Sequence, residues 1–267
     1  TRITVLEREK VRSSKELDYP IRSDEIGILA KQIQIMSKDL KLQMQQLEKF
    51  TTDVAHELKN PLTAIKSSSE LLLKNTVSEE NKIKLIKNFN KDVDRMNRLI
   101  SDISNFSRTM SEIEIEKFKL IELNQFLKKY IHNYHGNSKS INLKFLPYKS
   151  KLNILVNEDK LLQVIINLVE NSVSIANKNT SILFSTYKNI KNNEAEIRVY
   201  DQGKGISFQD KEKIFSRFYS DRDQYRSEHS GLGLSISKEV IKSFNGSIEL
   251  TKSDNLDFRG ACFIIKL

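Results

Sequence analysis

The sequence predicts an all-α helical hairpin followed by an α+β domain. Apolar residues recur every seven positions through the first part of the chain, which is typical of helices that pack as a coiled coil. Beyond about residue 115 the pattern changes to short apolar or alternating runs between helical patterns, which indicates a sheet covered by helices. We therefore expect three regions, at residues 1–48, 49–114 and 115–267.

Composition bounds the class of protein. The 267 residues have room for one large domain or two modest ones. The net charge of +9 could indicate a nucleic-acid partner, but Lys and Glu are interleaved along the predicted helices, so we interpret the excess as solvated helix faces and expect no nucleic-acid partner. The single cysteine, Cys262, cannot form an internal disulfide, which fits a reducing compartment. We expect it in the core of a terminal strand.

The first region begins with a short helix expected at residues 3–11. A long helix then starts at Ser23 or Asp24, either of which could cap it, and runs to about residue 74. Pro61 lies inside this helix and is expected to kink it, because proline removes a backbone donor. Two apolar tracks follow the helix: Ile26, Ile33, Leu40, Leu47 and Val54, and Leu29, Met36, Gln43 and Phe50.

A second helix is expected after the turn at residues 75–80, with Ser78 as a plausible cap. Its apolar residues repeat the spacing of seven. Two antiparallel helices with one apolar seam each cannot bury both seams alone, so we expect a four-helix bundle in a dimer. The tracks of this helix are Ile86, Val93 and Ile100, and Phe89, Met96, Ile103 and Met110.

The third region alternates between strand and helix patterns. Several strands are expected to pair as hairpins in one sheet, with the helices on one face. Strands are expected at 118–123, 143–146, 152–156, 182–187, 196–200, 247–250 and 261–267, and helices at 124–135, 158–177 and 231–245.

A histidine and a carboxylate stand side by side on the first long helix. With Val54 on the apolar seam, His56 falls on the solvent side, next to Glu57. An unperturbed imidazole has a pKa of about 6.5, so it is mostly neutral and nucleophilic near neutral pH. A lone exposed histidine usually has no role, so its meaning depends on the residues downstream.

The third region carries polar groups suited to a nucleotide. Asn167 and Asn171 are four apart on a predicted helix and share one face, and amide oxygens suit Mg²⁺ that already carries phosphate oxygens. Asp201 follows a predicted strand, where its carboxylate could accept a hydrogen bond from an exocyclic amine such as that of adenine. Gly203 and Gly205 after it would allow positive φ and close backbone approach.

A glycine-bearing helix start and a polar connector complete the pattern. Gly231 and Gly233 open a predicted helix, whose backbone N–H groups could bind a polyphosphate. The stretch before it resembles a hinged lid whose arginines, Arg217, Arg222 and Arg226, could reach phosphates. Each feature alone is more often structural: a buried amide, a turn or a helix start.

Taken in order, these residues resemble the sensor histidine kinases of two-component signalling. His56–Leu62 resembles the H box, Leu161–Ser172 the N box, Ile214–Tyr219 the F box, and Asp201–Gly205 and Gly231–Ile236 the two glycine boxes. The resemblance covers nearly the whole chain and implies an ATP-binding domain of the GHKL (Bergerat) type. Motif matches in one order are far more specific than any single match.

The resemblance also implies roles. His56 would be phosphorylated by ATP and pass the phosphoryl group to an aspartate of a response regulator, with Glu57 orienting the ring and taking up a proton. Asn60 would orient water for the reverse dephosphorylation. Asn167 and Asn171 would hold Mg²⁺. The implied nucleotide contacts are Asn167, Asn171, Asp201, Gly203, Gly205, Phe215, Arg217, Gly231, Leu232 and Gly233.

The chain departs from the family pattern at two places. Ser174 and Ile175 stand where the family often has a basic residue and an aromatic one. One phosphate contact is therefore open, which Lys178 or a lid arginine would replace. Residues 228–230 lack the usual extra glycines, which predicts a stiffer lid.

Two alternatives remain open on the sequence: a signalling scaffold that binds nucleotide but has weakened catalysis, and an ATPase of the related chaperone and DNA-repair clan. Ser23–Leu40 resembles the end of a HAMP signal relay. No run of about 18 apolar residues occurs, and the chain begins at Thr1. We expect the cytoplasmic portion of an inner-membrane protein whose sensing and spanning segments lie upstream.

Overall fold

The computed structural model of the chain describes residues 24–73, 77–112, 118–134, 141–177, 179–190, 192–206, 210–219 and 230–267. The helix expected at residues 3–11 lies outside them. The chain divides into two compact units, Thr1–Ala55 and His56–Leu267. Among the described helices, none combines the length and the apolar character that a membrane crossing requires.

The first long helix is α2, Glu25–Leu72. Its start is capped by Asp24, whose Oδ1 accepts a hydrogen bond from the backbone N–H of Gly27 over 3.1 Å. This confirms one of the two expected caps; the other lies outside the described residues. The helix continues through Pro61, which is buried. The apolar tracks of its first half are exposed, as Ile26 (61%) and Leu40 (58%) illustrate.

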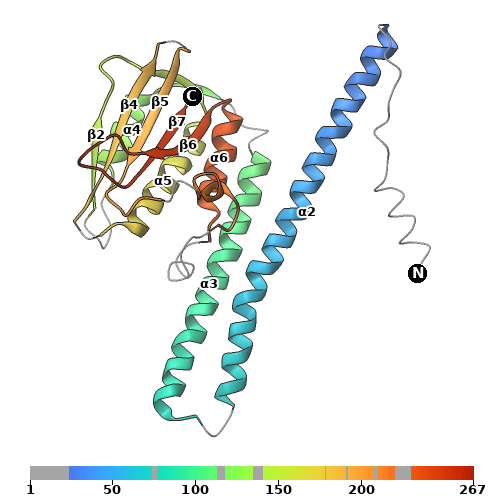
Figure 1. Ribbon diagram of the computed structural model, residues 1–267, viewed down its shortest axis with the longest axis vertical. Helices are drawn as coiled ribbons and strands as arrows, with labels where there is room; N and C mark the ends of the chain where they lie inside the picture. Colours follow the sequence, from blue (N-terminus) through green and yellow to red (C-terminus); the bar gives the residue numbers. More distant parts are fainter. Residues whose placement is uncertain are drawn as a thin grey trace. The chain divides into compact units, whose positions relative to one another are not determined.

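The second long helix is α3, Glu79–Glu112, and in the larger unit it runs back along α2 to form the predicted hairpin (Figure 1). Two residues outside the predicted tracks are buried within the single chain. Leu99 and Phe106, seven apart, are buried, whereas the track residues Ile86 and Ile100 remain about half exposed. Phe106 is covered in part by Arg217, whose guanidinium lies over its ring, and the burial of the track residues in a dimer stays a prediction.

The rest of the larger unit is the predicted α+β domain. Its main sheet has five strands in the order β2-β4-β5-β7-β6, in which β2 runs parallel to β4 and the other pairs are antiparallel. A single sheet was expected, but β1 and β3 form a separate antiparallel pair. The strands are β1 (Lys119–Glu122), β2 (Asn142–Leu146), β3 (Asn153–Val156), β4 (Ser181–Asn189), β5 (Glu194–Tyr200), β6 (Ser247–Lys252) and β7 (Ala261–Lys266).

Three helices, α4 (Leu123–His132), α5 (Glu158–Ile175) and α6 (Gly233–Ser243), cover one face of the sheet, and a short 3-10 helix, η2 (Lys213–Phe215), precedes α6 (Figure 1). Side chains fix the starts of two of them. The carboxylate of Glu122 accepts from two backbone N–H groups at the start of α4 and from that of Leu152, and Asn157 accepts from the N–H of Lys160 at the start of α5.

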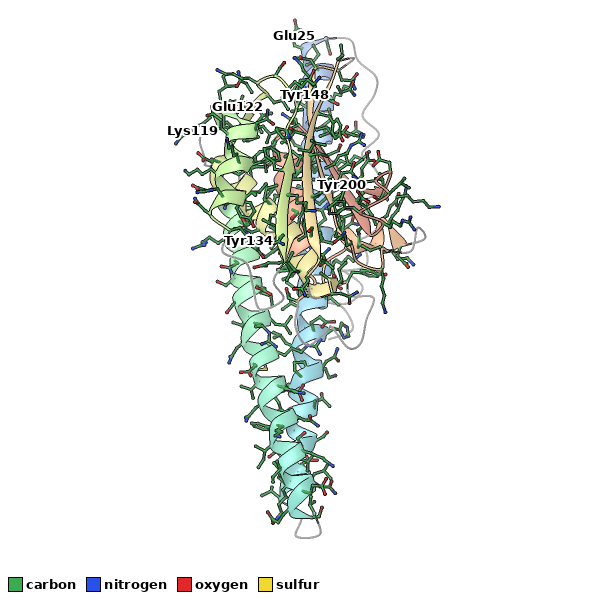
Figure 2. All side chains as sticks on the ribbon, turned by 90° about the vertical axis from the view of Figure 1, so that its left-hand side faces the viewer. Glu25, Lys119, Glu122, Tyr134, Tyr148 and Tyr200 are labelled. Atoms are coloured by element: carbon green, nitrogen blue, oxygen red, sulfur yellow. The ribbon has the colours of Figure 1, made fainter. Side chains whose placement is uncertain are left out.

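Both faces of the main sheet are buried, because successive residues of its strands point to opposite faces and many residues on each face are apolar. Ile197 and Val199 on β5 face the helices and are fully buried. Tyr200, marked in Figure 2, belongs to a second cluster on the other face that includes Phe258 from the β6–β7 connection. Cys262 is buried in that cluster on β7, as predicted. The sheet therefore fixes the end of β5, where the next residue is Asp201.

Candidate active site

Asp201 follows β5 directly, and its carboxylate is held asymmetrically. Oδ1 accepts hydrogen bonds from the backbone N–H groups of Gly203 (2.8 Å) and Ala261 (3.0 Å). Oδ2 is also buried but has no partner among the described residues. Burial raises the pKa of Asp201, and the two N–H donors offset only part of that rise. The buried Oδ2 is thus an acceptor with its donor missing.

The last strand supplies a support that sequence reasoning missed. The backbone N–H of Gly260 donates to the carbonyl of Asp201 over 3.1 Å. A Cβ on Gly260 would overlap the Oδ1 of Asp201, so only glycine fits against this carboxylate. The sequence signal is a glycine immediately before an apolar terminal strand, which indicates a close backbone approach only when its partner is known.

The first glycine turn packs against the end of α5. A Cβ on Gly203 would lie 3.1 Å from both the Oδ1 of Asp201 and the Cδ1 of Ile175. The absence of a side chain at Gly203 therefore lets the turn close between the carboxylate and the helix. Gly205 has a φ of +73°, as expected, whereas Gly203 does not have a positive φ.

The two asparagines lie on α5, and Asn167 connects it to the start of α6. Its Nδ2 donates to the carbonyl of Gly233 (3.0 Å) and to the Oγ of Ser237 (3.3 Å). This fixes the orientation of the amide and leaves Oδ1 without a partner among the described residues. One turn later, the Nδ2 of Asn171 is buried and has no partner within the described ranges. Two amides with unused capacity thus lie along one face of α5.

The start of α6 offers backbone donors. Leu232 is its N-cap residue, and among the described residues no side chain caps the helix. The first-turn N–H groups, which have no acceptor within any α-helix, therefore remain available to another acceptor. Leu232 itself is buried, and its N–H donates to the Oγ of Ser230 over 3.3 Å. The helix start can accept an anion, as the sequence predicts.

The stretch before α6 is locked to the second glycine turn. The N–H of Phe218 donates to the carbonyl of Gly231 over 3.0 Å. Gly231 has a φ of +74°, and a Cβ there would lie 2.7 Å from the carbonyl carbon of Phe218. Phe215 is buried edge-on against Phe263, with ring centroids 6.4 Å apart. The lid arginines Arg222 and Arg226 lie outside the described residues.

Arg217 contacts an aromatic ring of α3 in this structure. The sequence predicts a contact between this side chain and phosphates; here its guanidinium lies 5.1 Å from the centroid of the Phe106 ring on α3. A second contact joins the same helix to α5, between Thr109 and the side-chain amide of Gln163. The end of α3 thus docks on the α+β domain beside the candidate site.

The remaining predicted residues lie on the helical hairpin. His56 and Asn60 are exposed on α2, which confirms the predicted water-facing imidazole. Glu57 turns toward α3, and its Oε2 accepts from the Nη2 of Arg95 over 3.2 Å. Sequence reasoning missed Arg95, because its partner lies 38 residues away and no local spacing links them.

Two family models match the chain, and their order follows the two structural parts. Residues 46–112 match the His Kinase A (phospho-acceptor) domain. Residues 156–267 match the histidine kinase-, DNA gyrase B- and HSP90-like ATPase. The first match contains the histidine–carboxylate pair, and the second contains both asparagines and both glycine turns.

Similar proteins carry sensor-kinase names. The chain is 32% identical over 255 residues to the sensor protein ChvG of Agrobacterium fabrum, covering 90% of this chain and 42% of that protein. It is 29% identical over 268 residues to the sensor histidine kinase YclK of Bacillus subtilis, covering 94% and 55%. The chain therefore spans about half the length of these relatives.

One solved structure shares the fold over most of the chain. It is that of histidine kinase ThkA in complex with the response regulator protein TrrA, with a TM-score of 0.63 at 24% identity, covering 91% of this chain and 67% of that one. This match supports the predicted hairpin followed by an α+β ATPase domain.

Proposed function

This chain belongs to the sensor histidine kinases of two-component systems, and from that premise we propose that it phosphorylates His56 with ATP and passes the phosphoryl group to a response-regulator aspartate. The observation that carries the proposal is the buried, unpaired Oδ2 of Asp201. Leaving a buried carboxylate oxygen without a donor costs about 1–3 kcal/mol or more, so it is best explained by a ligand that supplies one.

The nucleotide contacts follow from the groups with unused capacity. The Oδ2 of Asp201 accepts from the exocyclic amine of adenine, and Gly203 and Gly205 keep the base close to the backbone. The phosphates lie at the start of α6, against the N–H groups that follow Leu232. The further residues proposed to line this site are Phe215, Gly231 and Gly233, together with Arg217 once it leaves Phe106.

The residues also fit a magnesium ion. The Oδ1 atoms of Asn167 and Asn171 would hold it, since neutral amide oxygens suit a cation that keeps phosphate and water ligands. When bound, Mg²⁺ neutralises charge on the phosphates. The hydrogen bond from Asn167 to Gly233 keeps one of these oxygens oriented toward the helix start.

The chemistry on His56 is a direct phosphoryl transfer. One ring nitrogen forms a bond to the γ-phosphorus while the bond to the bridging oxygen breaks, and ADP leaves with that electron pair. The proton on the ring moves to Glu57, whose carboxylate adjoins His56 in sequence. The phosphoryl group then moves from nitrogen to an aspartate oxygen of the partner, and Asn60 orients water for the reverse dephosphorylation.

The organisation proposed around this reaction has three parts: a HAMP-like relay and coiled coil at 1–48, a phosphoacceptor hairpin at 49–114 and an ATP-binding domain at 115–267. The exposed apolar track of α2 supports a homodimer that covers it with a second copy. We propose that the chain works in the cytoplasm as part of a longer inner-membrane protein, and that it binds no nucleic acid.

Incubation with γ-labelled ATP and Mg²⁺ tests the proposal. The wild-type chain should become labelled, and the label should be stable in base and labile in acid, as expected for phosphohistidine. His56→Gln should remain unlabelled while it still binds nucleotide. Label that persists in His56→Gln, or that survives acid, would contradict the proposal.

A scaffold with weakened catalysis is the second candidate, and Ser174 favours it. Its Oγ donates to the carbonyl of Asn171 over 2.7 Å, so at this position the side chain bonds its own helix, where the family often has a basic residue. A scaffold would bind ATP with the wild-type chain's full affinity and show no label on His56.

A further inference from the structure

We propose that Arg95 is a positioning residue for the phosphorylation of His56 and that it acts through Glu57. The inference rests on the proposed function and adds a residue on the opposite helix to it. Its basis is the ion pair between the Nη2 of Arg95 and the Oε2 of Glu57, 3.2 Å apart. The side chains are only 21% and 26% exposed, so water competes weakly for this contact.

Stability alone does not account for Arg95. Its Nε is buried and has no partner among the described residues, and a buried unpaired N–H opposes folding. An apolar side chain of similar length would fill the same space without that cost, as replacements of buried ion pairs often do. The pair is therefore better explained by what it does to Glu57 than by what it adds to the hairpin.

The geometry of α2 shows what Arg95 controls. Neighbouring residues on an α-helix point about 100° apart. When Arg95 holds Glu57 against α3, His56 faces water beside it, and His56 is indeed exposed. Without Arg95, the carboxylate is free to sample its other rotamers in water and no longer has one defined position relative to the imidazole.

This control matters at the moment of transfer. As the nitrogen–phosphorus bond forms, the ring gains positive charge and releases a proton. A carboxylate kept close stabilises that charge and accepts the proton. Arg95 touches neither ATP nor the ring in this scheme; it limits the positions that the Glu57 carboxylate can take when the proton is released.

Autophosphorylation of the full chain tests the proposal, with Arg95→Met, Glu57→Gln and the double variant. Arg95→Met should lower the labelling rate about ten- to a hundredfold, the scale of a misplaced catalytic group, with the KM for ATP unchanged. In the Glu57→Gln background, the same substitution should lower the rate by less than about threefold, because residues acting as one unit are not additive.

Lys91→Met is the matched control, because Lys91 is exposed one turn earlier on α3; it should label at the wild-type rate. Arg95→Lys, which keeps the charge, should recover part of the rate even if Arg95→Met folds poorly. Full additivity in the double variant, wild-type labelling by Arg95→Met, or no recovery by Arg95→Lys would overturn the positioning role. An unlabelled wild-type chain would instead refute the proposed function.

Discussion

The backbone N–H of Ala261 donates to the Oδ1 of Asp201 over 3.0 Å. The last strand, β7, therefore orients a carboxylate that lies 60 residues earlier in the sequence. The other oxygen is buried and has no hydrogen-bond partner in the described part of the chain. This asymmetry determines which oxygen a ligand can use, and it makes the identity of the side chain at Asp201 testable by ligand binding.

Asp201→Asn should weaken ATP and ADP binding about tenfold to a hundredfold. The buried Oδ2 becomes an NH₂ group in that variant, which presents a donor to the donor of adenine, and a hydrogen bond to a charged group contributes about 1.5–3 kcal/mol. Titration with a fluorescent ADP analogue measures the loss. Asp257→Asn, at an exposed carboxylate, is the control and should bind normally; equal affinities in the two variants would contradict the assignment.

The same substitution should stabilise the chain at neutral pH. Burial raises the pKa of Asp201 above the usual 3.8, so in the window above that value the native state holds a proton that the unfolded state releases. The free energy of unfolding contributed by Asp201 therefore falls as the pH rises through this window. The advantage of Asp201→Asn over wild type should grow as the pH rises above about 4 in urea unfolding; a constant or shrinking difference just above that pH would be inconsistent with it.

Two glycines with nearly the same φ should respond differently to alanine. Gly231→Ala meets Phe218 at 2.7 Å and should cost about 2–4 kcal/mol in unfolding free energy, besides weakening nucleotide binding. In Gly205→Ala, the new Cβ would lie 3.6 Å from its nearest neighbour among the described residues, so the variant should cost about 1–2 kcal/mol, from backbone strain alone. Denaturant unfolding of both variants measures the difference. Equal losses of unfolding free energy would show that the backbone at Phe218 moves aside to accommodate the new Cβ.

Removing the Phe106 ring should strengthen ATP binding. Phe106→Leu takes away a cation–π contact of about 0.5–1 kcal/mol, so Arg217 reaches the phosphates at less cost and affinity should rise about two- to fivefold. The control is Phe118→Leu, at a ring that instead packs on Phe244. Should Phe106→Leu bind ATP no better than wild type, Arg217 does not exchange between the two positions.

Much of the fold could be predicted from the sequence, because periodicity is local. The seven-residue tracks predicted α2 and α3, and alternating runs predicted every strand of the domain to within a few residues. Pairing is not local. Nothing in the run at 143–146 indicated that β2 would join β4 in parallel, or that β1 and β3 would leave the main sheet.

The site divides in the same way. Asp201, Asn167 and the glycines could be found because their residue types and order carry the chemistry. Gly260 and Arg95 could not, because each is defined by a partner that is distant in sequence. Arg217 could be named as a candidate from the sequence. Its contact with the Phe106 ring could not be predicted, because it depends on where the end of α3 packs.

The hydrogen bond from Phe218 to Gly231 has a consequence for how kinases of this design can diversify. Since it joins Phe218 to Gly231, the number of residues between these two positions can change without breaking this bond. Doubling a loop costs only about 0.6 kcal/mol in closure entropy. Segments of different length or charge can therefore replace residues 220–229 while Phe218 and Gly231 stay joined.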